Sequence, residues 1–332
     1  MAPGLCETGR VPQSRAPVLA LDTASLYFRS YYALPSSMTA PDGRPHNAVR
    51  GLLTTMTRLV EAYRPRGLVA AWDDDWRPQW RVDLVPTYKA HRAVEPATEA
   101  SPSSSDDAAE EVPEELGPQV DAIAELINLM GIPRWGVEHH EADDVLGSIA
   151  AREQHTIVVT GDRDLVQLID DSTRVLLTVN GGMEKWPLLD PSAAVDRFGV
   201  APGVYADMAV LRGDPSDGLP GVPGIGPKTA VALVNAFGDL SGVISAARRE
   251  PVERPLTART AARIDEFAEA LHRALTVTRV VRDLPLPSSV PPLPLGPADP
   301  GRLADLAQAW GVQRQVDELA RAFADSAQTL AE

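Results

Sequence analysis

The sequence predicts an α/β protein with a mainly parallel sheet and helices on both faces, followed by a helical region. In the first 190 residues, short apolar runs alternate with stretches of helical periodicity, which is the pattern of parallel strands joined by helices. Beyond that point only helical patterns and proline-rich sequence follow. With 332 residues, the chain has room for one large domain or two ordinary ones. We therefore expect an α/β domain at 17–190 and a helical region at 191–325.

The strands of the sheet are expected at the apolar runs 18–21, 67–72, 156–160 and 174–179. Apolar side chains at helical spacing predict helices over 47–63 and 120–130, and Gly131 is expected to end the second one. In parallel sheets, ligands bind beyond the carboxyl ends of the strands. Asp22, Asp73 or Asp74, and Asp162 fall at that position.

The sequence pattern of the second half of the chain predicts helices at 191–198, 202–212, 227–236, 240–248 and 258–276. Residues 284–300 contain seven prolines and are expected to be extended. One final amphipathic helix, containing Leu303, Leu306, Trp310 and Val312, is expected to finish the chain.

The net charge of −15 argues, taken alone, against a nucleic-acid partner. Its distribution changes that conclusion, because residues 93–125 carry ten acids and no base. If these ten acids and the nine carboxylates proposed below as metal ligands are left out, the net charge of the remaining residues is slightly positive. The stretch 93–117 is expected to be a mobile insert and residues 1–16 to be disordered.

Cys6 is the single cysteine, which excludes intramolecular disulfides and zinc ribbons and fits a reducing compartment. The N-terminus lacks the apolar segment of a signal peptide, and no apolar run of about 18 residues could span a membrane. We expect a cytoplasmic protein, associated with the nucleoid, that makes no contact with membranes.

Acidic clusters are the strongest chemical signal in the chain. Glu141, Asp143 and Asp144 form one cluster, and Asp162 and Asp164 follow the strand expected at 156–160. Carboxylates gathered in this way repel one another, and a hard divalent cation removes that penalty. Mg²⁺ or Mn²⁺ held by carboxylates normally serves phosphate chemistry.

Further acids extend this candidate site. Asp214 and Asp217 are spaced so that both carboxylates can face one way at the start of a helix or turn. With Asp22 and one acid of the 73–75 run, nine carboxylates come from five segments. A single acid of this kind is most often a helix cap or a solvated loop residue, but five clusters at the ends of one sheet favour a metal site.

A glycine-rich loop at 219–230 is the second strong signal. Gly221, Gly224 and Gly226 allow the backbone to turn tightly and approach a phosphate, and a helix is expected to begin at Pro227. Backbone N–H groups at that helix start, with Lys228 and Thr229, would face an anion. This pattern is typical of helix–hairpin–helix loops, which bind the DNA backbone without reading sequence.

Basic residues follow the second expected strand. This basic stretch could bind the scissile phosphate or the DNA strand, and it contains Arg77, Arg81, Tyr88, Lys89, His91 and Arg92. Arg29, which follows the first expected strand, could reach the same phosphate. Trp76 and Trp80 could equally be stacking platforms or core residues.

Five ordered motifs resemble the bacterial 5′-nuclease family, which includes the 5′-exonuclease domain of DNA polymerase I and free-standing flap endonucleases. The motifs lie at 21–29, 88–92, 141–144, 160–164 and 213–230, and the resemblance runs from about residue 17 to 325.

The resemblance implies a PIN-like α/β domain with an arch insert at about 90–118, and a helix–three-turn–helix DNA clamp within 191–325. It implies two or more Mg²⁺ or Mn²⁺ ions, and a K⁺ ion at the clamp. The implied ligands are Asp22, Asp74, Glu141, Asp143, Asp144, Asp162, Asp164, Asp214 and Asp217. Counting back from Arg81 favours Asp74, whereas the strand end favours Asp73. Lys89 and Arg92 would contact the scissile phosphate, with Arg29 nearby.

The resulting hypothesis is a monomeric, metal-dependent 5′-3′ DNA exonuclease or 5′-flap endonuclease, acting at flaps, nicks and 5′ ends in replication and repair. Two alternatives stay open: a PIN-like ribonuclease, which the glycine-rich loop disfavours, and a non-catalytic DNA-junction binder, which the complete set of acids disfavours.

Overall fold

The protein is built around a six-stranded sheet, described by a computed structural model that covers residues 16–92 and 113–331. The strand order is β3-β2-β1-β4-β5-β6, and neighbouring strands are parallel except for β5 and β6. The strands are β1 (Val18–Asp22), β2 (Gly67–Ala71), β3 (Arg134–Trp135), β4 (Thr156–Thr160), β5 (Thr173–Leu177) and β6 (Leu188–Leu189). The expected mainly parallel sheet is confirmed.

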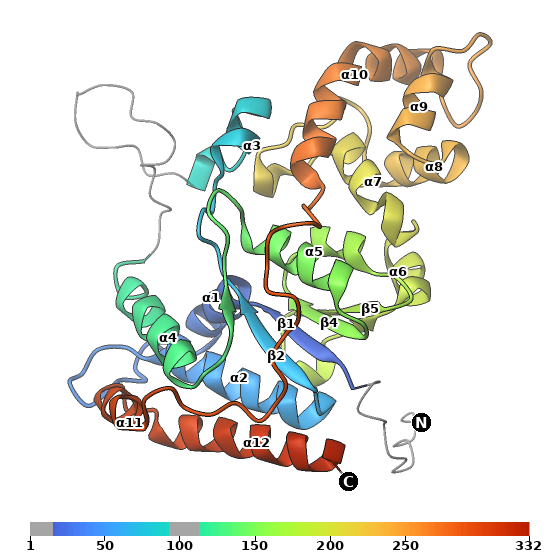
Figure 1. The fold of residues 1–332 in the computed structure, drawn as a ribbon. Coiled ribbons are helices and arrows are strands. Elements are labelled where there is room, and N and C mark those ends of the chain that lie inside the picture. Colours follow the sequence, from blue (N-terminus) through green and yellow to red (C-terminus); the bar gives the residue numbers. More distant parts are fainter. Residues whose placement is uncertain (1–15, 93–112, 332) are drawn as a thin grey trace, which may run out of the picture.

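Helices cover both faces of the sheet (Figure 1). Successive strand residues point to opposite faces, so Leu19 and Leu21 join one core and Val18 and Ala20 the other. The Leu19 face packs against α2 and α4, whereas the opposite face packs against α5. The helices of this part are α1 (Thr23–Ala33), α2 (Asn47–Tyr63), α3 (Gln79–Leu84), α4 (Gly117–Leu129) and α5 (Ala142–Arg152).

The second part is helical, as expected, and lies beside α3 at the top of Figure 1. It contains α6 (Pro191–Phe198), α7 (Tyr205–Arg212), α8 (Pro227–Phe237), α9 (Leu240–Ala247) and α10 (Ala258–Thr278). Each begins and ends within a few residues of its expected position. Among the residues described, no single helix is long and apolar enough to cross a membrane, and α8 with α9 meets that test only as a pair bent by 89°.

The C-terminal end differs from the expectation. The single final helix is wrong: α11 (Pro300–Ala309) and α12 (Gln313–Ala331) are separate helices, and Gly311 between them has a φ of 63°, which favours glycine. Leu303 and Phe323 are buried in the core of α2 and α4. These last helices therefore pack on the α/β part and not on α7–α10, although they were assigned to the helical region.

Residues 279–299 join α10 to α11 without forming a helix, as their prolines predict. This connecting segment runs back along α5, where backbone N–H groups of Val281 and Val290 donate to Asp144 and Glu153. It thereby links the helical part to the sheet. Of the segments expected to be disordered or mobile, 1–16 and 93–117, residues 1–15 and 93–112 lie outside the described residues. The ends of both segments differ from the expectation, because Ala16 and Leu116 are buried and α4 begins at Gly117.

Candidate active site

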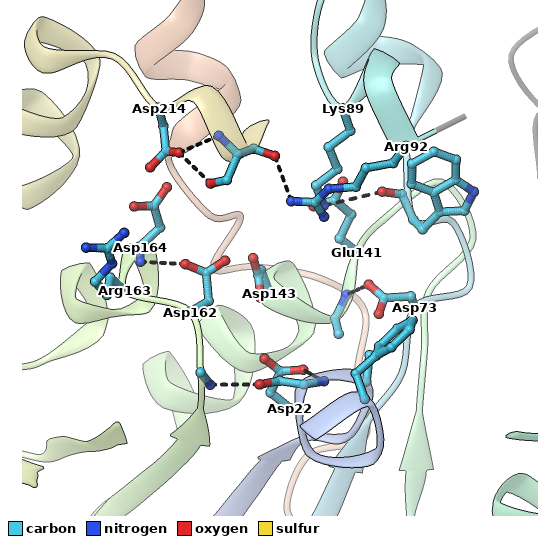
Figure 2. Close-up of a pocket in the computed structure, with 17 residues that line it drawn as sticks. Asp22, Asp73, Lys89, Arg92, Glu141, Asp143, Asp162, Arg163, Asp164 and Asp214 are labelled. Carbon is cyan, nitrogen blue, oxygen red and sulfur yellow. Dashed lines mark hydrogen bonds and ion pairs between the residues drawn. The ribbon is translucent and has the colours of Figure 1, made fainter. Parts of the chain in front are cut away.

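A cavity of about 350 Å³ opens at the carboxyl ends of the central strands (Figure 2). Asp22 ends β1, Asp162 and Asp164 follow β4, and Asp143 lies in the first turn of α5. Because parallel strands end at the same edge, segments far apart in sequence meet there. The acids that line the cavity are Asp22, Asp73, Glu141, Asp143, Asp162, Asp164 and Asp214.

Asp22 and Asp73 are fixed by hydrogen bonds at one side of the cavity. Asp22 caps α1, accepting from the backbone N–H of Ser25 (3.0 Å), and also accepts from the Thr160 hydroxyl (2.7 Å). Asp73 accepts from the backbone N–H of Ala142 at 2.8 Å. Burial raises the pKa of Asp22 to about 6 and that of Asp73 to about 7, partly offset by these hydrogen bonds.

The structure also distinguishes the two strand-end acids that the sequence left open. Asp73 lines the cavity, whereas Asp74 does not and instead packs against Gly136. The count from Arg81 favoured Asp74, but of these two acids only Asp73 lines the cavity, and its role as a metal ligand stays a prediction. Strand β2 ends at Ala71, so one residue, Trp72, separates the strand end from Asp73 at the cavity.

Asp164 is buried and Asp143 is half-buried, and within residues 16–92 and 113–331 neither carboxylate forms an ion pair with a cation. Burial, followed by repulsion from Asp162, raises the pKa of both well above the usual range. Asp217 lies at the edge of the cavity, and burial raises its pKa to about 6. Asp214 accepts from the backbone N–H of Ser216 at 2.9 Å and pairs with Arg212 at 3.3 Å.

Asp144 was expected to be a metal ligand, but it lies behind the cavity. Its side chain is fully buried, and its two oxygens face Arg81 at 3.0 and 2.7 Å. In a helix the side chain after Asp143 points about 100° away, and here Asp143 lines the cavity whereas Asp144 faces Arg81. The structure places Asp144 as a partner of Arg81, outside the lining of the cavity.

Lys89 and Arg92 lie on the opposite wall of the cavity, at the upper right of Figure 2. The Lys89 ammonium is 3.0 Å from Glu141, and Arg92 is 3.2 Å from Asp217. Lys89 has a φ of 48°, uncommon for a non-glycine residue, and its backbone N–H donates to the carbonyl of Asp217. Strained backbone at a charged pocket residue is typical of functional sites.

Four other predicted residues lie elsewhere or have different partners. Tyr88 is buried and its hydroxyl donates to Glu141, so it offers no stacking surface. Arg81 is buried against Asp144. Arg77 donates to the carbonyl of Tyr88 and so holds the turn before Lys89. Arg29 donates to the carbonyls of Val179 and Gly181 and lines a neighbouring cavity, not the acidic one.

The sequence analysis missed Arg163, Ser25 and Ser216, which also line the cavity. Arg163 is exposed between Asp162 and Asp164 (Figure 2). Its place between two candidate ligands was the signal that could have identified it.

The glycine-rich loop joins the acidic cavity to α8. Gly221 has a φ of 64°, and a Cβ there would lie 2.4 Å from the backbone nitrogen of Gly213. Gly224, Gly226 and Lys228 are exposed, and Thr229 is half-buried. The loop therefore presents backbone and a lysine to solvent at the start of α8, within ten residues of Asp217.

The donors of the cavity fit hard divalent cations, because they are carboxylate oxygens. Burial, and then repulsion from Asp162, raises the pKa of Asp143 and Asp164, and a bound cation would relieve that repulsion. In the part of the chain described, no three His, Cys, Asp or Glu side chains are grouped tightly enough to hold an ion as they stand.

Residues 17–199 match the family described as "5'-3' exonuclease, N-terminal resolvase-like domain", and residues 200–301 match "5'-3' exonuclease, C-terminal SAM fold". This chain belongs to the 5′-3′ exonuclease family. The resemblance drawn from the five motifs is confirmed, and so is the fold class.

Relatives support this assignment along nearly the whole chain. A 5′-3′ exonuclease of Streptomyces coelicolor is 50% identical over 91% of this chain and 98% of its own length. One of Mycobacterium tuberculosis is 45% identical over 93% of this chain and 98% of its own. DNA polymerase I of that species is 32% identical over 86% of this chain but only 30% of its own length.

Two solved structures share the fold. The T5 D15 protein, co-crystallised with metal ions, has a TM-score of 0.60 and 17% identity, covering 94% of this chain and 99% of its own. The catalytic core of Rad2, in complex with a DNA substrate, has a TM-score of 0.56 and 14% identity, covering 94% and 95%. At these identities the likeness supports the fold alone.

Proposed function

We propose that this family member is a divalent-metal-dependent 5′-3′ DNA exonuclease and 5′-flap endonuclease that acts on branched or nicked DNA in replication and repair. The observation that carries the proposal is the single cavity in which seven acids face Lys89 and Arg92 beside the glycine-rich loop. All these residues come from one chain, which supports action as a monomer.

Mg²⁺ or Mn²⁺ bound by these acids would supply an activated water and stabilise the leaving oxygen of a phosphodiester. Asp22, Asp73 and Asp143 would hold ions on the sheet side, and Asp162, Asp164, Asp214 and Asp217 on the side of the helical part. Lys89 and Arg92 form what we call the cation wall of the cavity. Glu141 lines the cavity and also contacts Lys89 and Tyr88, so it orients this wall through Lys89.

Lys89 and Arg92 would bind the scissile phosphate and offset the charge that grows as the bond breaks. Both now contact carboxylates, Glu141 and Asp217. An incoming phosphate competes with these partners, while cations in the cavity compensate the released acids. Lys89 and Arg92 are therefore each paired with one acid before substrate arrives.

The exposed glycine loop and the N-terminus of α8 would bind a DNA backbone away from the cut, with Lys228 adding charge. The resemblance to the 5′-nuclease family also implies a K⁺ ion at this loop, and that remains a prediction.

Cleavage of a 5′-labelled flap in Mg²⁺, compared with a single-stranded RNA of the same sequence, tests the proposal. We expect flap cutting that Asp143→Asn abolishes. Faster cutting of the RNA would favour a ribonuclease, and tight flap binding without cutting would favour a junction binder. As a second measurement, Mg²⁺ should raise the Tm of the wild type more than that of Asp143→Asn, because ligands that bind only the folded state stabilise it.

A further inference from the structure

A buried ion pair lies directly behind the acidic cavity. It joins Arg81 of α3 to Asp144 of α5, with nitrogen–oxygen distances of 3.0 and 2.7 Å. The Arg81 side chain is 2% exposed and that of Asp144 is 0% exposed. Planar bidentate pairs of this kind fix both partners in orientation as well as distance.

Both partners make further contacts that connect the cavity with the helical part. Arg81 is 3.3 Å from the carboxylate of Glu141, and its Nε donates to the carbonyl of Val277 near the end of α10 (3.1 Å). Asp144 accepts from the backbone N–H of Val281 in the connecting segment (2.9 Å). One pair thus joins the cavity wall, α3, α5 and the exit of α10.

Glu141 transmits this arrangement to the cation wall. Its carboxylate also accepts from the Tyr88 hydroxyl (2.9 Å) and contacts the Lys89 ammonium (3.0 Å). Arg81 and Tyr88 are both buried contacts of Glu141 outside the lining of the cavity, and Arg81 in addition joins Glu141 to Asp144 and α10. The position of Lys89 therefore depends on Glu141, which in turn depends on Arg81.

We propose that Arg81 and Asp144 are a positioning pair, which holds Glu141 and Lys89 in place for phosphodiester cleavage, and that Asp144 is not a metal ligand. This inference rests on the proposed nuclease function. It assigns Arg81 a role through Glu141, without contact with DNA or metal.

A second ion pair at the other end of α5 provides a matched control. Arg66 is 2.7 Å from Glu153, and Glu153 accepts from the backbone N–H of Val290, again in the connecting segment (2.7 Å). This is also an arginine–carboxylate pair that ties α5 to the connecting segment, although Arg66 is partly exposed and makes a single contact with Glu153; neither residue lines the acidic cavity. Its loss should affect stability without disturbing Lys89.

The first experiment compares Arg81→Met with Arg66→Met, using single-turnover flap cleavage at saturating DNA and Mg²⁺, and Tm. Both variants should lower Tm, because each leaves a buried carboxylate unpaired. Only Arg81→Met should slow cleavage, by about tenfold or more, as is typical for residues that orient a catalytic group. Its affinity for duplex DNA in Ca²⁺ should stay within about twofold, since phosphate contacts carry affinity.

Arg81→Lys keeps the charge but loses the bidentate geometry, so it should fold and recover part of the rate. It serves as the test variant if Arg81→Met fails to fold. Equal rate losses in Arg81→Met and Arg66→Met, or a rate loss fully explained by DNA affinity, would overturn the positioning role.

The second experiment adds Asp144→Asn and the double variant Arg81→Met/Asp144→Asn. A positioning pair predicts non-additive losses, and a Tm of the double variant above that of Arg81→Met, because no buried charge is left unpaired. The Mg²⁺ concentration for half-maximal Tm shift should change by less than about threefold in Asp144→Asn.

A metal ligand would behave differently: Asp144→Asn would raise that midpoint about tenfold or more, with or without Arg81. That outcome would contradict the proposal that Asp144 is a positioning residue and not a metal ligand. The Tm cycle does not require activity, so a wild-type protein that cuts no flap would refute the proposed function and still report whether the pair is coupled.

Discussion

The acidic cavity and the glycine-rich loop are neighbours in the fold but differ in almost every physical property. The cavity is lined by buried or half-buried acids near strand ends and helix starts, and burial raises the pKa of Asp22 and Asp73. The loop presents exposed backbone and one lysine, and its shape depends on Gly221. In the proposed function, charges at fixed positions serve the chemistry, whereas accessible backbone serves binding.

Because of this contrast, we expect substitutions in the cavity and substitutions in the glycine-rich loop to affect cleavage rate and DNA affinity differently. Substitutions in the cavity should change the rate of cleavage with little effect on DNA affinity. Substitutions in the loop should do the reverse. A variant that mixed the two effects would show that the regions are coupled.

The largest effect is expected for the two neighbouring acids after β2. Asp73→Asn removes a carboxylate from the cavity, and losing metal-based stabilisation worth several kcal/mol corresponds to roughly a thousandfold in rate. Asp74→Asn is the matched control, since Asp74 lies outside the cavity. Single-turnover flap cleavage in Mg²⁺ measures both. A comparable loss in Asp74→Asn would restore the alternative that counting back from Arg81 had favoured.

The next effect concerns the cation wall. Lys89→Ala and Arg92→Ala should each slow cleavage by roughly a hundredfold, because they remove positive charge from the phosphate that reacts. Affinity for the same DNA in Ca²⁺ should fall far less, since many phosphate contacts share it. If the loss of affinity accounts for the whole loss of rate, both residues only tether the phosphate.

The sequence predicted the sheet and most of the cavity for a physical reason. Strands β1, β2 and β4 are apolar runs followed by acids, and parallel strands bring such acids to one edge. The spacing of apolar residues likewise predicted α8, α9 and α10 closely. These features depend on local pattern, which a single sequence displays.

Features that depend on which side chains meet across the fold were not predicted. Asp143 and Asp144 are adjacent acids, and only the approach of Arg81 from α3 shows that the second one faces away from the cavity. Arg81 was predicted to contact DNA because it is basic and lies in a basic stretch, but its side chain is buried. The docking of α12 on α2 joins residues more than two hundred positions apart, and no local pattern indicates it.

The smallest effect is expected in the glycine-rich loop. Lys228→Ala removes one exposed charge near the start of α8, so affinity for duplex DNA should fall several-fold and the salt slope by about one unit. The loss should be equal for different duplex sequences, because backbone contacts carry no sequence information. The cleavage rate at saturating DNA should be unchanged.

Arg302→Ala provides the control for that measurement. Arg302 is also an exposed cation, but it lies on α11, at the opposite end of the molecule from α8 in Figure 1. If only the net charge of the protein mattered, both substitutions would weaken DNA binding equally, and the loop would lose its special role. A loss confined to Lys228→Ala, with a lower salt slope, would localise the phosphate contact at the start of α8. A loss confined to some duplex sequences would instead mean that the loop reads bases, contrary to the contrast between the two regions.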